Sequence, residues 1–263
     1  MPRVFIGVGH GGKDVGAIKY VKESDANLYM ALAMKKELER HGVVVGISRV
    51  KDENDPLSEE IQEANAFKPD IAVEVHNNAG GGDGFEVYRQ TNGYSSKSIK
   101  LAQCIEKRAK AHGQNSRGIK TKLNSSGTDY FGWLRQVKAP AVLCEGFFVD
   151  NAKDAADFDT VAEQEAYGKA YAHGVLDYFG IPVKASTEGV RYDYTVQVGA
   201  FSKYENAMAL SKKLTSMGYS VRIVGAGDGD MVYVGKFITK PEAEKTANDL
   251  KKKGFDGFVK KVV

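Results

Sequence analysis

Short apolar runs and longer segments of helical periodicity alternate through roughly the first 180 residues. The apolar runs are bounded by glycine, asparagine or charge, and they predict strands at Val4–Val8, Val43–Ile47, Ile71–Val75, Phe85–Tyr88 and Ala141–Cys144. Between them, apolar residues at helical spacing predict helices at Glu23–Arg40, Ser58–Phe67, Ser96–His112 and Ala162–Tyr178. This alternation is typical of an α/β domain with a mostly parallel sheet flanked by helices.

The C-terminal part contains an internal repeat. VQVGAF (Val196–Phe201) recurs as VYVGKF (Val232–Phe237), and each copy predicts a strand, a helix and a second strand. We therefore expect a small α+β domain of ferredoxin-like βαββαβ topology. The stretch before it, IPVKASTEGV, has no periodicity and indicates a linker. The expected organisation is a domain at residues 1–181, a linker at 182–190 and a second domain at 191–263.

Composition and charge exclude several classes of protein. The net charge of +3 over 263 residues is far below that of a dedicated nucleic-acid binder, so we expect no nucleic-acid partner. Cys104 and Cys144 match no CxxC spacing, and we expect both to be buried thiols. No apolar run approaches the roughly 20 residues of a membrane span, and no signal peptide precedes the first strand.

Two histidines stand where predicted strands end. The first strand runs into GHGGKDVGA, which contains His10, and a later strand runs into VHNNAG, which contains His76. A phosphate-binding loop is the competing interpretation of the first segment, but GxGxxG before a helix and GK[ST] are both missing. Because open α/β sheets bind ligands at the carboxyl ends of their strands, the two imidazoles favour a zinc site.

Two carboxylates complete the candidate site. Glu23 stands at the start of the first helix and would serve as a third metal ligand, although Asp14 and Asp25 compete for that role. Glu145 ends an apolar strand, and a buried carboxylate is costly unless it is paired or takes part in chemistry. Such a group can accept a proton from an attacking water, and the alternative is a salt bridge with Arg135 or Lys138.

Four segments together resemble one enzyme family. GHGGKDVGA, KESDANL, DIAVEVHNNA and PAVLCEGFFVDN are similar in order and spacing to the zinc-dependent N-acetylmuramoyl-L-alanine amidases of type 3, over roughly residues 2–180. The resemblance implies a phosphorylase/hydrolase-like amidase fold and one Zn²⁺ ion. It also implies that His10, Glu23 and His76 are the zinc ligands and that Glu145 is the catalytic glutamate.

The chain departs from the family around the second histidine. The family usually has Ser-Ile-His-Ala-Asn there, whereas residues 74–78 read Glu-Val-His-Asn-Asn. Glu74 would either point away from the site or support a ligand, and the sequence leaves both open. We also expect Asn78 to contact substrate.

The C-terminal repeat resembles the SPOR domain, a peptidoglycan-binding module. Out-facing Gln197 and Tyr233 are the expected wall contacts, while the valines that alternate with them would form the core of the small sheet. The implied reaction is zinc-assisted hydrolysis of the amide between N-acetylmuramic acid and L-alanine in peptidoglycan. A non-catalytic wall-binding protein on an amidase scaffold and a zinc peptidase for another amide are the alternatives.

The expected localisation follows from the missing signal peptide. We expect synthesis in the cytoplasm and action on the cell wall after release, as for a phage endolysin or an autolysin freed by lysis of a sporulating mother cell.

Overall fold

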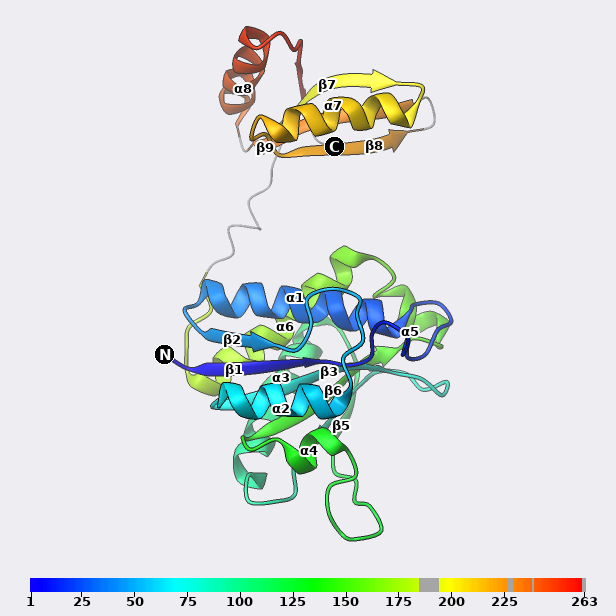
Figure 1. Cartoon of the computed structure of the whole chain (residues 1–263), viewed down its shortest axis with the longest axis vertical. Coiled ribbons are helices and arrows are strands. Elements are labelled where there is room, and N and C mark those ends of the chain that lie inside the picture. The colour runs from blue at the N-terminus through cyan, green and yellow to red at the C-terminus, as the bar shows by residue number, and fades with distance from the viewer. Residues whose placement is uncertain (185–193, 227–228, 238, 262–263) are drawn as a thin grey trace. The chain divides into compact units, whose positions relative to one another are not determined.

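The structure, a computed structural model, describes residues 1–184, 194–226, 229–237 and 239–261 (Figure 1). The chain divides into two compact units, with the boundary between Lys184 and Ala185. Of the linker expected at residues 182–190, residues 185–190 lie outside the described part of the chain.

The N-terminal unit is built on a six-stranded sheet in the order β2-β1-β3-β6-β4-β5. Neighbouring strands are parallel except for β4, which runs antiparallel to β6. The mostly parallel α/β sheet is therefore confirmed. The strands are β1 (Arg3–Val8), β2 (Val44–Ile47), β3 (Ile71–Asn78), β4 (Phe85–Arg89), β5 (Ser116–Lys120) and β6 (Ala141–Phe148).

Helices cover both faces of this sheet, as Figure 1 shows. The larger core packs the sheet against α1 (Glu23–Arg40), α3 (Ser95–His112) and α6 (Val161–Phe179). The opposite face packs against α2 (Leu57–Phe67) and α4 (Gly132–Gln136). A short helix, α5 (Ala152–Ala156), follows β6.

The pleat of the central strands sends alternate side chains to different cores. On β3, Val73 and Val75 face the larger core, whereas Ala72 faces the smaller one. On β6, Cys144 joins the larger core and Leu143 the smaller one. Residues later on these strands that share the face of Ala72 and Leu143 therefore point to the side of α2 and α4.

Several elements differ from the expectations. Strand β5 was not predicted because its residues, SRGIK, are half-buried or exposed and lack a regular apolar pattern. The helices α4 and α5 have five residues each, too few for a visible period. The strands β3 and β6 continue to Asn78 and Phe148, so His76 and Glu145 lie within strands rather than just beyond them.

Both cysteines are free thiols, but they differ in burial. Cys144 is buried, as expected, whereas Cys104 is only partly buried, because it lies toward the edge of the apolar face of α3. Among the described residues, no helix is both long and apolar enough to cross a membrane.

The C-terminal unit is a four-stranded antiparallel sheet in the order β10-β7-β9-β8. Buried valines on β7 and β9 pack against Leu214 and Leu250 of its two helices, so the α+β expectation is confirmed. Its elements are β7 (Tyr194–Phe201), α7 (Tyr204–Ser216), β8 (Val221–Ala226), β9 (Gly229–Phe237), α8 (Lys240–Lys252) and β10 (Phe258–Lys261).

The close packing of α6 on α1 generates a prediction. A Cβ atom added at Gly168 would lie 2.1 Å from the carbonyl oxygen of Met30. Gly168→Ala should therefore lower the free energy of unfolding by about 1–3 kcal/mol, although alanine is otherwise the better helix former. Urea denaturation measures the change. Gly93→Ala is the control, because an added Cβ there meets no atom within 4 Å. Equal stability of the two variants would contradict the packing argument.

Candidate metal centre and active site

Two histidines and one glutamate converge at the carboxyl ends of β1 and β3. His10 follows β1, Glu23 is the first residue of α1, and His76 lies near the end of β3. Glu23 Oε1 lies 3.2 Å from His10 Nε2 and 3.1 Å from His76 Nδ1. One ligand atom from each residue lies within 4.8 Å of the others, so the three can hold one metal ion.

The backbone around His10 is shaped to bring the two rings together. His10 has φ 63°, a left-handed conformation that is uncommon outside glycine. At Gly9, an added Cβ would lie 2.1 Å from His76 Nε2, so only glycine fits at that position. Buried Asn27 donates a hydrogen bond of 3.0 Å to the Gly9 carbonyl and fixes the turn from the side of α1.

Glu23 is held as a carboxylate by surrounding donors. The backbone N–H groups of Ala17 and Asn77 donate to its two oxygens at 3.0 and 3.3 Å. Burial disfavours its charge, but the interactions with His10 and His76 hold the pKa of Glu23 well below its usual range.

The competing carboxylates Asp14 and Asp25 lie elsewhere. Asp25 pairs with Lys22 at 2.8 Å, and Asp14 Oδ1 lies 3.0 Å from His10 Nδ1, on the side of the ring away from Glu23. Glu23 is therefore the carboxylate that lies between the two histidines.

Glu74 faces the candidate site and does not point away from it. Residues two apart on a strand share a face, and Glu74 Oε1 lies 3.4 Å from His76 Nε2. Burial alone lowers the pKa of His76, but its interactions with Glu23 and Glu74 raise it. Each histidine thus has one nitrogen toward Glu23 and the other near a second carboxylate, the arrangement common for metal-ligating histidines.

Glu145 lies beside His76 in the register of β3 and β6. Its Oε2 is buried and has no hydrogen-bond partner in the part of the chain that the structure describes. Burial raises the pKa of the Glu145 carboxyl to about 7. Arg135 instead donates to the carbonyls of Asp129 and Tyr130 at 2.7 and 2.9 Å. The salt-bridge alternative is not observed among the described side chains, and Glu145 is available for proton transfer.

Arg49 is a structural part of the site that the sequence analysis missed. It is 2% exposed and follows β2, where a lone arginine gives no functional signal. Its guanidinium donates at 2.8–3.2 Å to four backbone carbonyls, those of Val8, Gly9, Ser24 and Lys51. It thereby connects the end of β1 to the start of α1.

The expected wall-contact residues of the C-terminal unit lie on the open face of its sheet. Gln197 pairs with Tyr233 across β7 and β9 and with Phe258 of β10, and Tyr233 pairs with Arg222 of β8. The Arg222 guanidinium lies 5.1 Å from the centre of the Tyr233 ring, and Phe258 is 69% exposed. The four side chains form a row across the sheet, which we call the sheet-face row.

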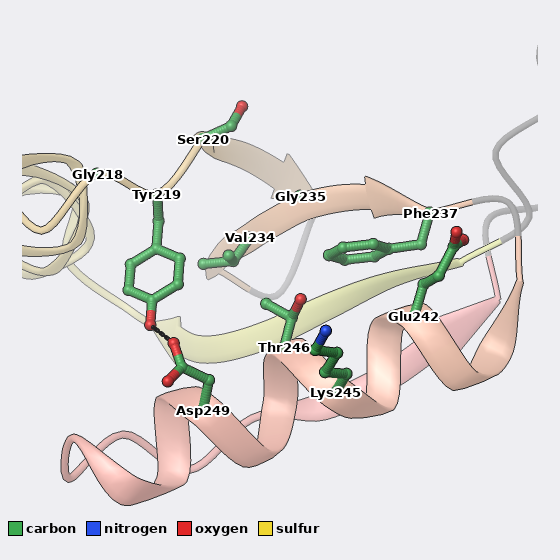
Figure 2. Close-up of a pocket in the computed structure, with 10 residues that line it drawn as sticks. All are labelled: Gly218, Tyr219, Ser220, Val234, Gly235, Phe237, Glu242, Lys245, Thr246 and Asp249. Atoms are coloured by element: carbon green, nitrogen blue, oxygen red, sulfur yellow. Dashed lines mark hydrogen bonds between the residues drawn. The ribbon is translucent and has the colours of Figure 1, made fainter.

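A pocket lies on the opposite, helix-covered side of the same sheet (Figure 2). Its walls include Val234 and Phe237 of β9 together with Thr246 and Asp249 of α8, and Tyr219 donates a hydrogen bond to Asp249. In the first repeat, the residue equivalent to Thr246 is Leu210, which packs into the core of the unit. The pocket therefore lies where the second repeat has the smaller Thr246, and Tyr219 of the first repeat closes one side of it.

Comparison with known proteins finds two family models that match different parts of the chain. The family model for N-acetylmuramoyl-L-alanine amidase matches residues 4–177, and that for the SPOR domain matches residues 191–261. A sporulation-specific N-acetylmuramoyl-L-alanine amidase of Bacillus subtilis (strain 168) is 32% identical over 83% of this chain and 83% of its own length. An endolysin of Bacillus phage SPP1 is 34% identical over 69% of this chain and 68% of its own length.

A solved structure extends the comparison to the fold. The catalytic domain of CwlV, an N-acetylmuramoyl-L-alanine amidase from Bacillus (Paenibacillus) polymyxa var. colistinus, matches with a TM-score of 0.62 and 28% identity. The match covers 69% of this chain and 100% of that domain.

The carbonyls bound by Arg49 generate a second prediction. Arg49→Met removes donors from four backbone carbonyls, and we expect the free energy of unfolding to fall by about 2–4 kcal/mol. Urea denaturation measures it. Lys51→Met is the matched control, because the Lys51 side chain is 71% exposed and should contribute less than about 0.5 kcal/mol. A loss below about 1 kcal/mol for Arg49→Met would show that these bonds do not hold the site together.

Proposed function

Because the chain belongs to the N-acetylmuramoyl-L-alanine amidase family and carries a SPOR domain, a cell-wall binding module, we propose that it is a zinc-dependent peptidoglycan hydrolase. The bond cleaved is the amide between the lactyl group of N-acetylmuramic acid and L-alanine of the stem peptide. The observation that carries this proposal is Glu23 between two imidazoles, with the unpaired carboxyl of Glu145 beside them.

His10, Glu23 and His76 would hold the zinc ion. Two imidazole nitrogens and one carboxylate oxygen are a frequent donor set of catalytic zinc, and three protein ligands leave a position open for water or substrate. A bound zinc ion polarises the amide carbonyl and lowers the pKa of water. The donor set of this chain fits such an ion.

Glu145 is the group that moves the proton. It accepts a proton from the water that attacks the carbonyl carbon, and it returns that proton to the nitrogen as the carbon–nitrogen bond breaks. The products are a muramyl carboxylate and a peptide with a free L-alanyl amine. A pKa near 7 suits a group that must both accept and donate a proton close to neutral pH.

The alternatives differ in what they require of these residues. A non-catalytic scaffold has no need for an unpaired buried carboxyl beside the donor set, because that carboxyl costs stability. A zinc peptidase would use the same four residues, and the new termini that it releases would distinguish it from an amidase.

We further propose that the sheet-face row contacts the cell wall. Its aromatic rings and its amide and guanidinium groups offer stacking and hydrogen bonding over one exposed face. Gln197 and Tyr233 lie at its centre. Asn78, the third expected contact residue, lies at the end of β3, opposite Phe148 of β6.

Glu145→Gln should strongly reduce catalysis and leave metal binding intact. Removing the general base should lower the rate of wall hydrolysis by about 100- to 10,000-fold. His76→Ala, in contrast, should lose the zinc itself. The rate is followed by new amino groups without new reducing sugars, and zinc content by elemental analysis of the purified chain. Retained lysis by Glu145→Gln would contradict the mechanism, and one zinc per chain in His76→Ala would contradict the ligand assignment.

Binding to walls distinguishes the two faces of the C-terminal unit. In a full chain that also carries Glu145→Gln, Tyr233→Ala should weaken binding to purified walls about tenfold, because it removes the central ring of the row. Thr246→Leu, which places the side chain of the first repeat into the pocket, should leave binding unchanged. The opposite result in a sedimentation assay would assign wall binding to the pocket of Figure 2.

A further inference from the structure

A second polar cluster lies beside Glu145 and is not used by the proposed mechanism. At its centre is Glu86 of β4, which is 3% exposed. Lys120 donates to its Oε1 at 2.6 Å, and Arg117 donates to the same oxygen through Nε. Tyr88 and Asn78 donate to Oε2 at 3.3 and 3.4 Å. Because Glu86 already accepts four hydrogen bonds, it is not available for proton transfer, and it instead holds the surrounding side chains in place.

A bulge in β5 brings both cations to this carboxylate. Residues three apart on a regular strand point to opposite faces, so Arg117 and Lys120 would normally diverge. The pairing of β5 with β4 shifts by one residue at this point, between Ser116 opposite Phe85 and Ile119 opposite Val87. Bulges of this kind re-aim side chains next to active sites. The shift places Arg117 and Lys120, which we call the cation pair, on Glu86.

The cation pair is fixed in place and still accessible. The Arg117 and Lys120 side chains are 42% and 33% exposed. Arg117 is held through Nε, and its Cζ lies 5.2 Å from the centre of the Phe148 ring. Among the described residues its terminal Nη groups make no hydrogen bond. They therefore remain available as the planar fork that binds carboxylates.

The cluster is adjacent to the reaction site. Glu86 stands directly opposite Glu145 in the antiparallel pairing of β4 and β6. Cβ atoms of such pairs are about 4.5–5.5 Å apart and lie on the same face. We propose that Arg117 and Lys120 form a subsite that binds a carboxylate of the substrate next to the scissile amide.

The chemistry of the substrate identifies which carboxylate this is, and the assignment rests on the proposed function. Before cleavage, the lactyl carboxyl of muramic acid is part of the amide, so the sugars at the scissile bond carry no charge. Negative charge close to that bond therefore lies in the peptide, on the residues that follow L-alanine. The cation pair would select stem peptides with a free carboxylate over those in which it is amidated.

The test compares two soluble substrates with the zinc-loaded full chain. One is a disaccharide linked to L-alanyl-D-glutamate, and the other is the same compound with both glutamate carboxylates converted to carboxamides. The wild-type chain should cleave the carboxylate form with a kcat/KM about 10- to 100-fold higher. Lys120→Met and Arg117→Met should reduce this preference to within about threefold, mainly by losing activity on the carboxylate form. Both variants should also digest intact walls with free carboxylates about tenfold more slowly.

Lys110→Met is the matched control, because Lys110 is an exposed cation at the end of α3. It should change neither the preference nor the rate on walls. If Lys120→Met and Arg117→Met lower kcat/KM equally on both substrates, the cation pair only supports Glu86 and does not bind substrate. If the wild-type chain shows no preference for the carboxylate form, the proposed subsite is wrong. If the wild-type chain digests no wall and cleaves neither compound, the proposed function itself fails.

Discussion

The pleat of the central strands is the constraint on which the rest of the structure depends. Alternation places Val73 and Val75 in the larger core, and the same alternation must place Glu74 and His76 on the opposite face. The face that carries them is covered by α2 and α4 over the apolar residues earlier on the strands, such as Leu143. The core and the candidate site are thus two consequences of one register. A slip of one residue in β3 would move His76 into the larger core and the valines onto the face of the candidate site.

Several carboxylates lie close together at this edge, and their neighbours give them different roles. Glu23 and Glu86 each accept hydrogen bonds from several donors, and both keep a pKa below the usual range despite burial. Glu145 has no such donors among the residues that the structure describes, and burial raises its pKa instead. Groups of one chemical type with opposite shifts in pKa are typical of sites that need both a fixed charge and a mobile proton. The acidic charge is balanced locally by histidines at Glu23 and by the cation pair at Glu86.

The sequence predicted the parts of this arrangement that are encoded by local periodicity or by distinctive residues. Strong apolar runs located β1, β3 and β6, and the histidines near the ends of β1 and β3 indicated the candidate metal centre. Arg49 and the bulged strand β5 were missed because their roles arise from long-range contacts. Arg49 donates hydrogen bonds to carbonyls up to 41 residues away in the sequence. Lys120 reaches Glu86 only because β5 pairs with β4. By spacing, Asp14 and Asp25 competed with Glu23 as the third ligand, and the structure distinguishes Glu23 because it alone of the three lies between the two histidines.

The two repeats of the C-terminal unit also show that positions in the core are constrained, whereas positions outside it can differ. Positions that face the core are nearly identical in both copies, as in Val196 and Val232, because each must fill the same space between sheet and helix. Positions outside that core or at its margin have diverged: Gln197, on the open face, corresponds to Tyr233, and Leu210, at the margin of the core, corresponds to Thr246. A duplicated fold thereby presents two different surfaces, one flat and aromatic, the other hollow and partly charged. In the C-terminal unit the shared core fixes which residues of the two copies are equivalent, and in both units the candidate functional residues lie at positions outside the cores.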